Sequence, residues 1–136
     1  MIYKIAFAEQ ALIDLNLTAD YIKFKLCNIS AANKLIQDFF HEADSLSHFP
    51  TRAPLCNDKI LRTLEIRFLP IRNYLLFYVV KESIKTVYII RFLYAKRNWQ
   101  KILHKQASKG ENLYTSAFTT NYVQESKEKY EASSKY

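Results

Sequence analysis

The sequence predicts an α+β domain whose elements follow one another as β-α-α-β-β-β-α. Two stretches between residues 8 and 50 repeat apolar residues every three or four positions, as amphipathic helices do. Residues 74–80 and 87–93 are rich in β-branched and aromatic residues, which favours strands. The segment between these two strands, 81–85, is short and polar, which is typical of an antiparallel hairpin.

The first half of the chain predicts a strand and two helices. Residues 2–7 alternate in polarity and predict the strand, and a helix begins at about Ala8 and ends at 28–30. Ser30 is the predicted N-cap of the second helix, which ends at Pro50. The two apolar stripes are Leu12, Leu15, Ala19, Ile22 and Leu26, and Leu35, Ile36, Phe39, Phe40, Ala43 and Leu46. Two such helices joined by a short turn predict a helical hairpin.

The second half of the chain predicts three strands and a short helix. Residues 51–58 predict a loop, residues 60–69 a strand with interleaved charges, and residues 70–73 a turn. The two apolar strands follow. Residues 96–105 predict a C-terminal helix whose apolar side carries Trp99, Ile102 and Leu103.

The strand at 74–80 is apolar on both of its faces. Alternation places Leu75, Phe77 and Val79 on one face. The other face carries Tyr74, Leu76, Tyr78 and Val80. Because antiparallel sheets usually expose one face to water, two apolar faces require two covers. The second cover is either a partner protein or another part of this chain.

The charge of the chain indicates an acidic partner. The formal net charge is +7, and residues 106–136 carry four lysines and four glutamates, so the whole excess lies in residues 1–105. A basic domain binds nucleic acid or an acidic protein. The alternative is a basic protein without such a partner.

Other features of the composition exclude several classes of protein. Cys27 and Cys56 form no disulfide framework, and the cysteines and three histidines show no metal-ligand spacing, so we expect no metal and no cofactor. The single glycine excludes glycine-rich phosphate loops. We see neither a transmembrane segment nor a signal peptide, and expect a cytoplasmic protein with free thiols.

The chain divides into two predicted regions. Residues 1–105 form the domain, and residues 106–136 form a polar tail that we expect to be disordered. The alternative for the tail is a weak helical stripe through Tyr114, Phe118 and Tyr122, which follow one another at intervals of four.

Several motifs in residues 1 to about 104 resemble the RelE/ParE toxins of bacterial type II toxin–antitoxin modules. The parts are the opening strand YKI at 3–5, EQALIDL at 9–15 and LSHFP at 46–50. The more specific parts are LPIRNYLLFY at 69–78 and IRFLYAKRNW at 90–99. The resemblance implies a helical hairpin packed on a twisted antiparallel sheet. It also implies a cognate acidic antitoxin that lies across the toxin and covers the second apolar face, at Leu75, Phe77 and Val79.

The resemblance leaves two mechanisms open. RelE-like members are similar to ribonucleases that cut mRNA on the ribosome, whereas ParE-like members poison DNA gyrase. RNA cleavage needs a base, an acid and cations for the phosphorane charge. Where RelE-like members carry an arginine after the strand-opening tyrosine, this chain has Leu75, and their late tyrosine falls near Leu103, with His104 beside it. The incomplete set favours the gyrase hypothesis. A third hypothesis is a degenerate, non-toxic binding module.

The candidate site residues come from the basic, aromatic segments. We predict that the residues contacting the target or nucleic acid are Arg67, Arg72, Arg91, Tyr94, Lys96 and Arg97. For a ribonuclease, the candidates for catalysis are Arg91, Tyr94 and Arg97. Arg91 interrupts an apolar strand, so it lies either at an exposed margin of the sheet or in a functional groove. The resemblance also implies roles in plasmid stabilization and growth inhibition.

Overall fold

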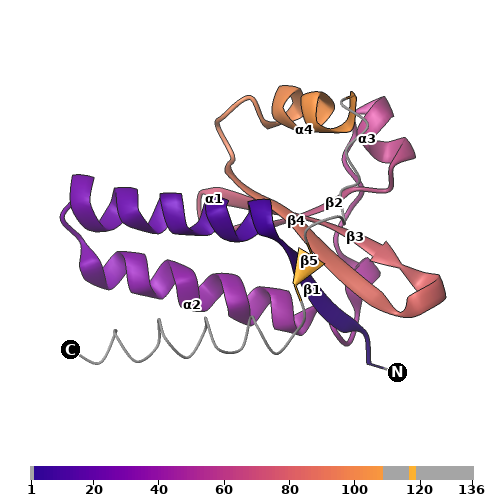
Figure 1. The fold of residues 1–136 in the computed structure, drawn as a ribbon, viewed down its shortest axis with the longest axis horizontal. Coiled ribbons are helices and arrows are strands. Elements are labelled where there is room, and N and C mark those ends of the chain that lie inside the picture. Colours follow the sequence, from indigo (N-terminus) through magenta and orange to yellow (C-terminus); the bar gives the residue numbers. More distant parts are fainter. Residues whose placement is uncertain (1, 109–116, 119–136) are drawn as a thin grey trace.

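The structure, a computed structural model, describes residues 2–108 and 117–118 (Figure 1). The strands are β1 (Lys4–Ala8), β2 (Arg67–Ile71), β3 (Tyr74–Lys81), β4 (Thr86–Tyr94) and β5 (Ala117–Phe118). The α-helices are α1 (Glu9–Asp20), α2 (Ile29–Ser45), α3 (Lys59–Thr63) and α4 (Trp99–Ser108). A π-helical turn, Tyr21–Lys25, extends α1, and short 3-10 turns occupy Pro50–Arg52 and Glu82–Ile84. The predicted order is confirmed, with α3 and β5 as additions.

The sheet has the strand order β2-β3-β4-β1-β5 and is mixed. The hairpins β2–β3 and β3–β4 are antiparallel as expected, and β5 pairs antiparallel with β1. However, β1 runs parallel to β4, with Lys4 opposite Thr86 and Phe7 opposite Ile89. The expectation of an antiparallel sheet is therefore corrected for this pair. Parallel neighbours need a long crossover, and the chain that includes the helical hairpin supplies it.

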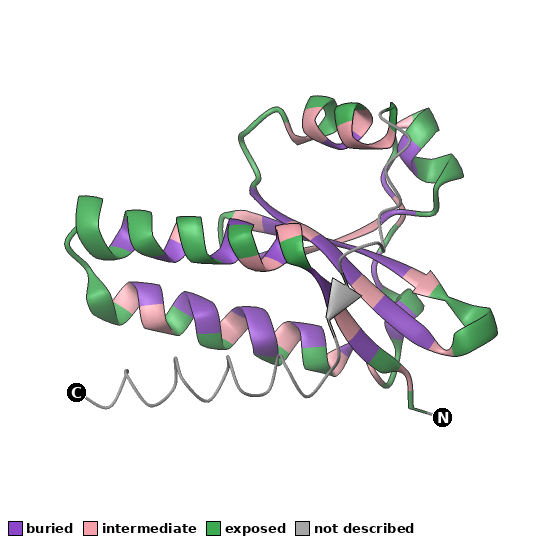
Figure 2. Cartoon of the chain, viewed as in Figure 1, coloured by how far each residue is buried: buried purple, intermediate pink, exposed green. Residues whose placement is uncertain are grey.

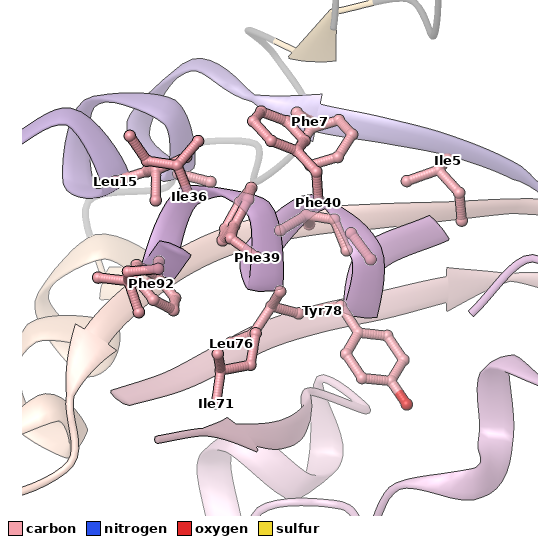
Figure 3. Packing of buried hydrophobic residues seen from close by; sticks show 14 of the residues in the cluster. Ile5, Phe7, Leu15, Ile36, Phe39, Phe40, Ile71, Leu76, Tyr78 and Phe92 are labelled. Atoms are coloured by element: carbon pink, nitrogen blue, oxygen red, sulfur yellow. The ribbon is translucent and has the colours of Figure 1, made fainter. Parts of the chain in front are cut away.

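The helical hairpin covers one face of the sheet and forms the larger core (Figure 3). Its centre is aromatic: the ring of Phe39 lies 5.7 Å from that of Phe7, 5.1 Å from that of Phe40 and 5.1 Å from that of Phe92, measured between centroids. These rings come from α2, β1 and β4. The predicted face of β3 is confirmed, since Leu76 and Tyr78 point into this core.

The helices α3 and α4 cover the other face of the sheet (Figure 2). Leu75, Phe77 and Val79 are buried there, together with Leu61 of α3 and Leu103 of α4. The ring centroid of Trp99 lies 5.1 Å from that of Phe77 and 6.4 Å from that of Phe68. Of the two covers considered above, the structure therefore shows an internal one, and a partner is not needed to shield this face from water.

Three predicted boundaries are wrong. Residues 60–63 are helical, because Asp58 Oδ1 accepts hydrogen bonds from the amides of Ile60 and Leu61 at 3.0 and 3.1 Å and so caps α3. Asn28, rather than Ser30, caps α2, accepting from Ala31 N at 3.0 Å. The last helix spans 99–108 rather than the predicted 96–105. The tail prediction for 109–116 and 119–136 lies outside the described residues.

Glu65 occupies a backbone position that usually belongs to glycine. It follows α3 with φ of 58°, and the amides of Glu65 and Ile66 donate to the carbonyls of Arg62 and Leu61, the two bonds of a Schellman motif. We expect Glu65→Gly to stabilise the fold by about 0.5–1 kcal/mol, because glycine adopts this conformation without a Cβ clash. Urea unfolding measures this gain. Glu65→Ala is the control; an equal gain in the control would contradict the explanation, because alanine keeps the Cβ.

Candidate functional site

A turn after β4 presents an aromatic ring and two cations. The amide of Arg97 donates to the carbonyl of Tyr94 at 3.0 Å, which brings the two residues within about 7 Å. The amide of Ala95 donates to the carbonyl of Asn73 at 2.9 Å and ties this turn to the β2–β3 turn. Tyr94 is 41% exposed, and Lys96 and Arg97 are exposed as well. Neither cation forms an ion pair with a described residue.

A second tyrosine packs against Tyr94. The ring of Tyr74, at the start of β3, stacks on Phe92 at 5.3 Å and lies 5.6 Å from the ring of Tyr94. Burial raises the pKa of Tyr74, and the neighbouring phenols of Tyr94 and Tyr21 raise it further. Tyr21, on the π-helical turn, is 56% exposed.

Sequence reasoning missed Tyr74 as a neighbour of Tyr94. No signal in the sequence separates Tyr74 from an ordinary strand residue, because its ring neighbours Phe92 and Tyr94 come from β4.

Arg91 forms a mostly buried ion pair and does not lie at an exposed margin of the sheet. Its Nε and Nη2 lie 2.8 and 3.0 Å from the two carboxylate oxygens of Asp14 in α1. Its Nη1 donates to Gln106 Oε1 at 3.3 Å. The side chains of Arg91 and Asp14 are 12% and 7% exposed. This placement corrects the exposed margin expected for Arg91, and its role at a target stays a prediction.

Asp14 also completes the hydrogen bonding of the sheet. The pairing of β1 with β4 ends at Ile89, so the next amides of β4 have no strand partner on this side among the described residues. Asp14 Oδ2 accepts from the backbone amide of Phe92 at 3.0 Å, and Gln10 Nε2 donates to Asp14 Oδ1 at 3.1 Å. A strong anionic acceptor therefore replaces a strand at this edge.

The two remaining arginines have different surroundings. Arg67 Nη1 donates to the carbonyls of Ala53 at 2.7 Å and Thr51 at 3.3 Å, so it holds the loop before α3 in place. Arg72 forms an exposed ion pair with Asp38 at 2.7 Å. Among the six predicted target-binding residues, the structure thus brings Tyr94, Lys96 and Arg97 together on one turn. Arg72 is next to Asn73, to which that turn is bound.

The predicted antitoxin-binding residues Leu75, Phe77 and Val79 lie beneath α4. Two polar contacts accompany the packing of this helix. His104 Nε2 lies 2.7 Å from Asp58 Oδ1, and Gln106 accepts from Arg91 as described above. The backbone amide of Leu61 and the imidazole of His104 hold the pKa of Asp58 below its usual value.

The acid–base candidates on the described residues have different neighbours. Burial raises the pKa of the Cys56 thiol to about 11, so it remains protonated at neutral pH. His104 contacts Asp58 beside α3, whereas Tyr94 packs on Tyr74. Leu75 supplies no charge and is buried. No group of three or more His, Cys, Asp or Glu side chains within the described ranges is placed to hold a metal ion.

None of the described helices has both the length and the apolar composition required to cross a lipid bilayer.

The fold is that of known toxins. The structure resembles that of the chromosomal ParDE toxin–antitoxin system from P. aeruginosa, with a TM-score of 0.58 and 18% identity, covering 70% of this chain and 98% of that chain. It also resembles the free state of an E. coli RelE mutant, with a TM-score of 0.53 and 16% identity, covering 82% of this chain and all (100%) of that chain. These likenesses show a RelE/ParE-like α+β fold and confirm the predicted fold class.

The sequence itself identifies the family. The family model for the ParE toxin of the type II toxin–antitoxin system parDE matches residues 5–99. The chain therefore belongs to this toxin family, as its motifs indicated. A search of curated proteins found no match.

Proposed function

We propose that this chain is a toxin that inhibits DNA gyrase by binding it. The observation that carries the proposal is the environment of Leu75. In RelE-like ribonucleases this position holds a cation, whereas here it holds an apolar side chain that α4 buries. Arg91, a second cation considered for phosphate chemistry, is paired with Asp14. A protein with this surface acts through shape and charge complementarity rather than through proton transfer.

In this proposal, the target is bound by the turn after β4. Lys96 and Arg97 are exposed without ion-pair partners among the described residues, so their charges remain available for a partner. Tyr94 adds an amphipathic ring of the kind that is enriched in the centres of interfaces. Arg72 contributes less, because Asp38 already neutralises part of its charge.

The double variant Lys96→Glu, Arg97→Glu tests this surface in cells. We expect it to abolish growth inhibition, because reversing two charges at the centre of an interface places like charges against the partner. Tyr94→Phe is expected to remain toxic, since it retains the ring. The matched control is Lys59→Glu with Arg62→Glu, two exposed cations on α3, which we expect to remain toxic. Circular dichroism checks that each variant is folded.

The readouts after induction are gyrase-linked DNA breaks and mRNA cleavage mapped within codons. We expect DNA breaks with intact messages. Cleaved messages without DNA breaks would refute the proposal and support the RelE-like ribonuclease. In that case Tyr94→Phe lowers the cleavage rate by about 10²–10⁴-fold if its hydroxyl is the acid or base. If neither DNA breaks nor cleaved messages appear with the unchanged chain or any variant, the result supports the non-toxic binding module.

We propose further that an acidic antitoxin binds the sheet face formed by Leu75, Phe77 and Val79 and displaces α4 from it. This face is apolar, and any segment that replaces α4 regains the same burial. Within α4, Leu103 is the one fully buried residue, and Trp99 is half-buried, so the helix covers the face with few side chains. The charge excess in residues 1–105 favours an acidic partner.

Trp99 reports on this displacement because it is the only tryptophan of the chain. When the antitoxin binds, we expect its emission to shift to the red as it leaves Phe77 for water. Hydrogen exchange is expected to show less protection of α4 and retained protection of β3. Greater protection of α4 in the complex, without a change in emission, would mean that the antitoxin binds elsewhere. The control is the complex of the antitoxin with the Lys59→Glu variant. Removing this exposed charge changes only the electrostatic part of the affinity, so the shift in Trp99 emission on binding is expected to remain.

A further inference from the structure

The helical hairpin carries large apolar side chains that the fold leaves exposed. On α1 and its π-helical extension they recur at intervals of four, four and three positions, which places them on one side: Ile13, Leu17, Tyr21 and Phe24. Leu26 and Ile29 follow at the end of the hairpin that lies farthest from the sheet (Figure 2). We call these six side chains, which are between 40% and 66% exposed, the hairpin surface.

The hairpin surface is larger than the apolar patches that monomers usually expose. Because a large apolar side chain has about 200 Å² of surface when fully exposed, the six together present roughly 700 Å². The largest apolar patch of a monomeric protein is usually about 300–600 Å². Two hairpin surfaces packed against each other bury up to about 1,400 Å², which lies within the range of about 1,200–2,000 Å² for specific interfaces.

The charges around the hairpin surface distinguish between partners. Within residues 9–29 the exposed charged residues are two acidic and two basic ones: Glu9, Asp20, Lys23 and Lys25. This segment is therefore locally neutral, although it belongs to a domain that carries the whole net charge of +7. Nucleic acid, an acidic protein or an anionic lipid surface gains no net electrostatic attraction here. Another basic domain of the same kind meets no net repulsion here, so the second copy is the partner that this surface fits.

We propose that two copies of this chain associate through their hairpin surfaces into a homodimer with twofold symmetry. Both copies use the same surface, so every contact occurs twice. We expect a dissociation constant of about 1–100 μM, because the buried area is at the lower end of the range for specific interfaces. The dimer goes beyond the proposed inhibition of gyrase and forms without gyrase or an antitoxin.

Sedimentation equilibrium of the full chain, over about 1–300 μM, tests the proposal. We expect monomers at the lowest concentrations and dimers at the highest. Leu17→Glu is expected to raise the dissociation constant roughly a hundredfold, because both copies then bring a carboxylate into an apolar contact. Phe24→Ala is expected to raise it at least about tenfold, because apolar area is lost from both copies.

The matched control is Ile60→Glu. Ile60 is an exposed aliphatic residue of α3, at 53% exposure, and lies outside the hairpin surface. This variant receives the same carboxylate as Leu17→Glu, and we expect its dissociation constant to equal that of the unchanged chain. Since Leu17 and Phe24 are exposed, their variants are expected to remain folded, which circular dichroism checks.

Salt provides a second test of the contact. Raising the ionic strength from about 0.05 M to about 0.5 M screens the long-range repulsion between two basic domains. We therefore expect the dimer to become tighter as salt is added. A dimer that weakens steeply with salt would be held by opposite charges, which contradicts an apolar contact at a neutral surface.

Three further results would overturn the proposal. One is a chain that remains monomeric at every concentration, and another is a dimer that Leu17→Glu leaves unchanged. The third is a monomer whose α1 and following turn gain protection from hydrogen exchange only when an antitoxin is added, since the antitoxin is then the occupant. None of the assays of the chain alone contains gyrase, so a failure of the gyrase proposal leaves them unaffected.

Discussion

Asp14→Ala is expected to destabilise the fold by about 3–5 kcal/mol, because it leaves the guanidinium of Arg91 buried without its partner. The carboxylate accepts two hydrogen bonds from Arg91, one from the backbone amide of Phe92 and one from Gln10 Nε2. All four donors lose their acceptor in the variant. Since domains of this size are stable by about 5–15 kcal/mol, the variant loses a large part of its stability.

Urea unfolding monitored by circular dichroism measures this loss, and two further variants locate its cause. Asp38→Ala breaks the exposed ion pair with Arg72 and is expected to cost less than about 1 kcal/mol. Asp14→Leu combined with Arg91→Met removes both buried charges, and we expect it to recover much of the stability of the unchanged chain. A loss for Asp14→Ala no larger than that for Asp38→Ala would show that Arg91 finds water when Asp14 is removed.

Phe39→Ala is expected to destabilise the fold by about 3–5 kcal/mol through the cavity it leaves in the larger core. Phe39 is fully buried (0% exposed), and its ring contacts those of Phe7, Phe40 and Phe92 (Figure 3). These neighbours belong to three elements, so they cannot all move inward to fill the space.

Phe49→Ala is the matched control for the Phe39 variant. Phe49 is 62% exposed, and we expect its replacement to change the unfolding free energy by less than about 0.5 kcal/mol. Unfolding in urea compares the two variants with the unchanged chain. A small loss at Phe39 would indicate that α2 shifts toward the sheet to close the cavity.

Local patterns determined much of this fold. The alternation in β3 assigned Leu75 and Phe77 to one face and Leu76 and Tyr78 to the other, and the structure shows both assignments. Apolar spacing predicted both helices of the hairpin and the short last helix. These patterns are reliable because side-chain direction repeats with the period of the backbone, whatever the neighbours are. The error at 60–63 has a local cause as well, since a capping aspartate overrode a strand-like composition.

The sequence by itself determined the α+β class, the order of the elements, the two apolar faces of β3 and the family motifs. Only the tertiary structure decided that α4 covers the second face, that β1 runs parallel to β4, and that Arg91 meets Asp14 across 77 positions. It also decided that the rings of Tyr74 and Tyr94 pack against each other. The physical reason is that each of these contacts depends on how elements distant in the chain pack together, whereas hydrophobic periodicity describes only one element at a time.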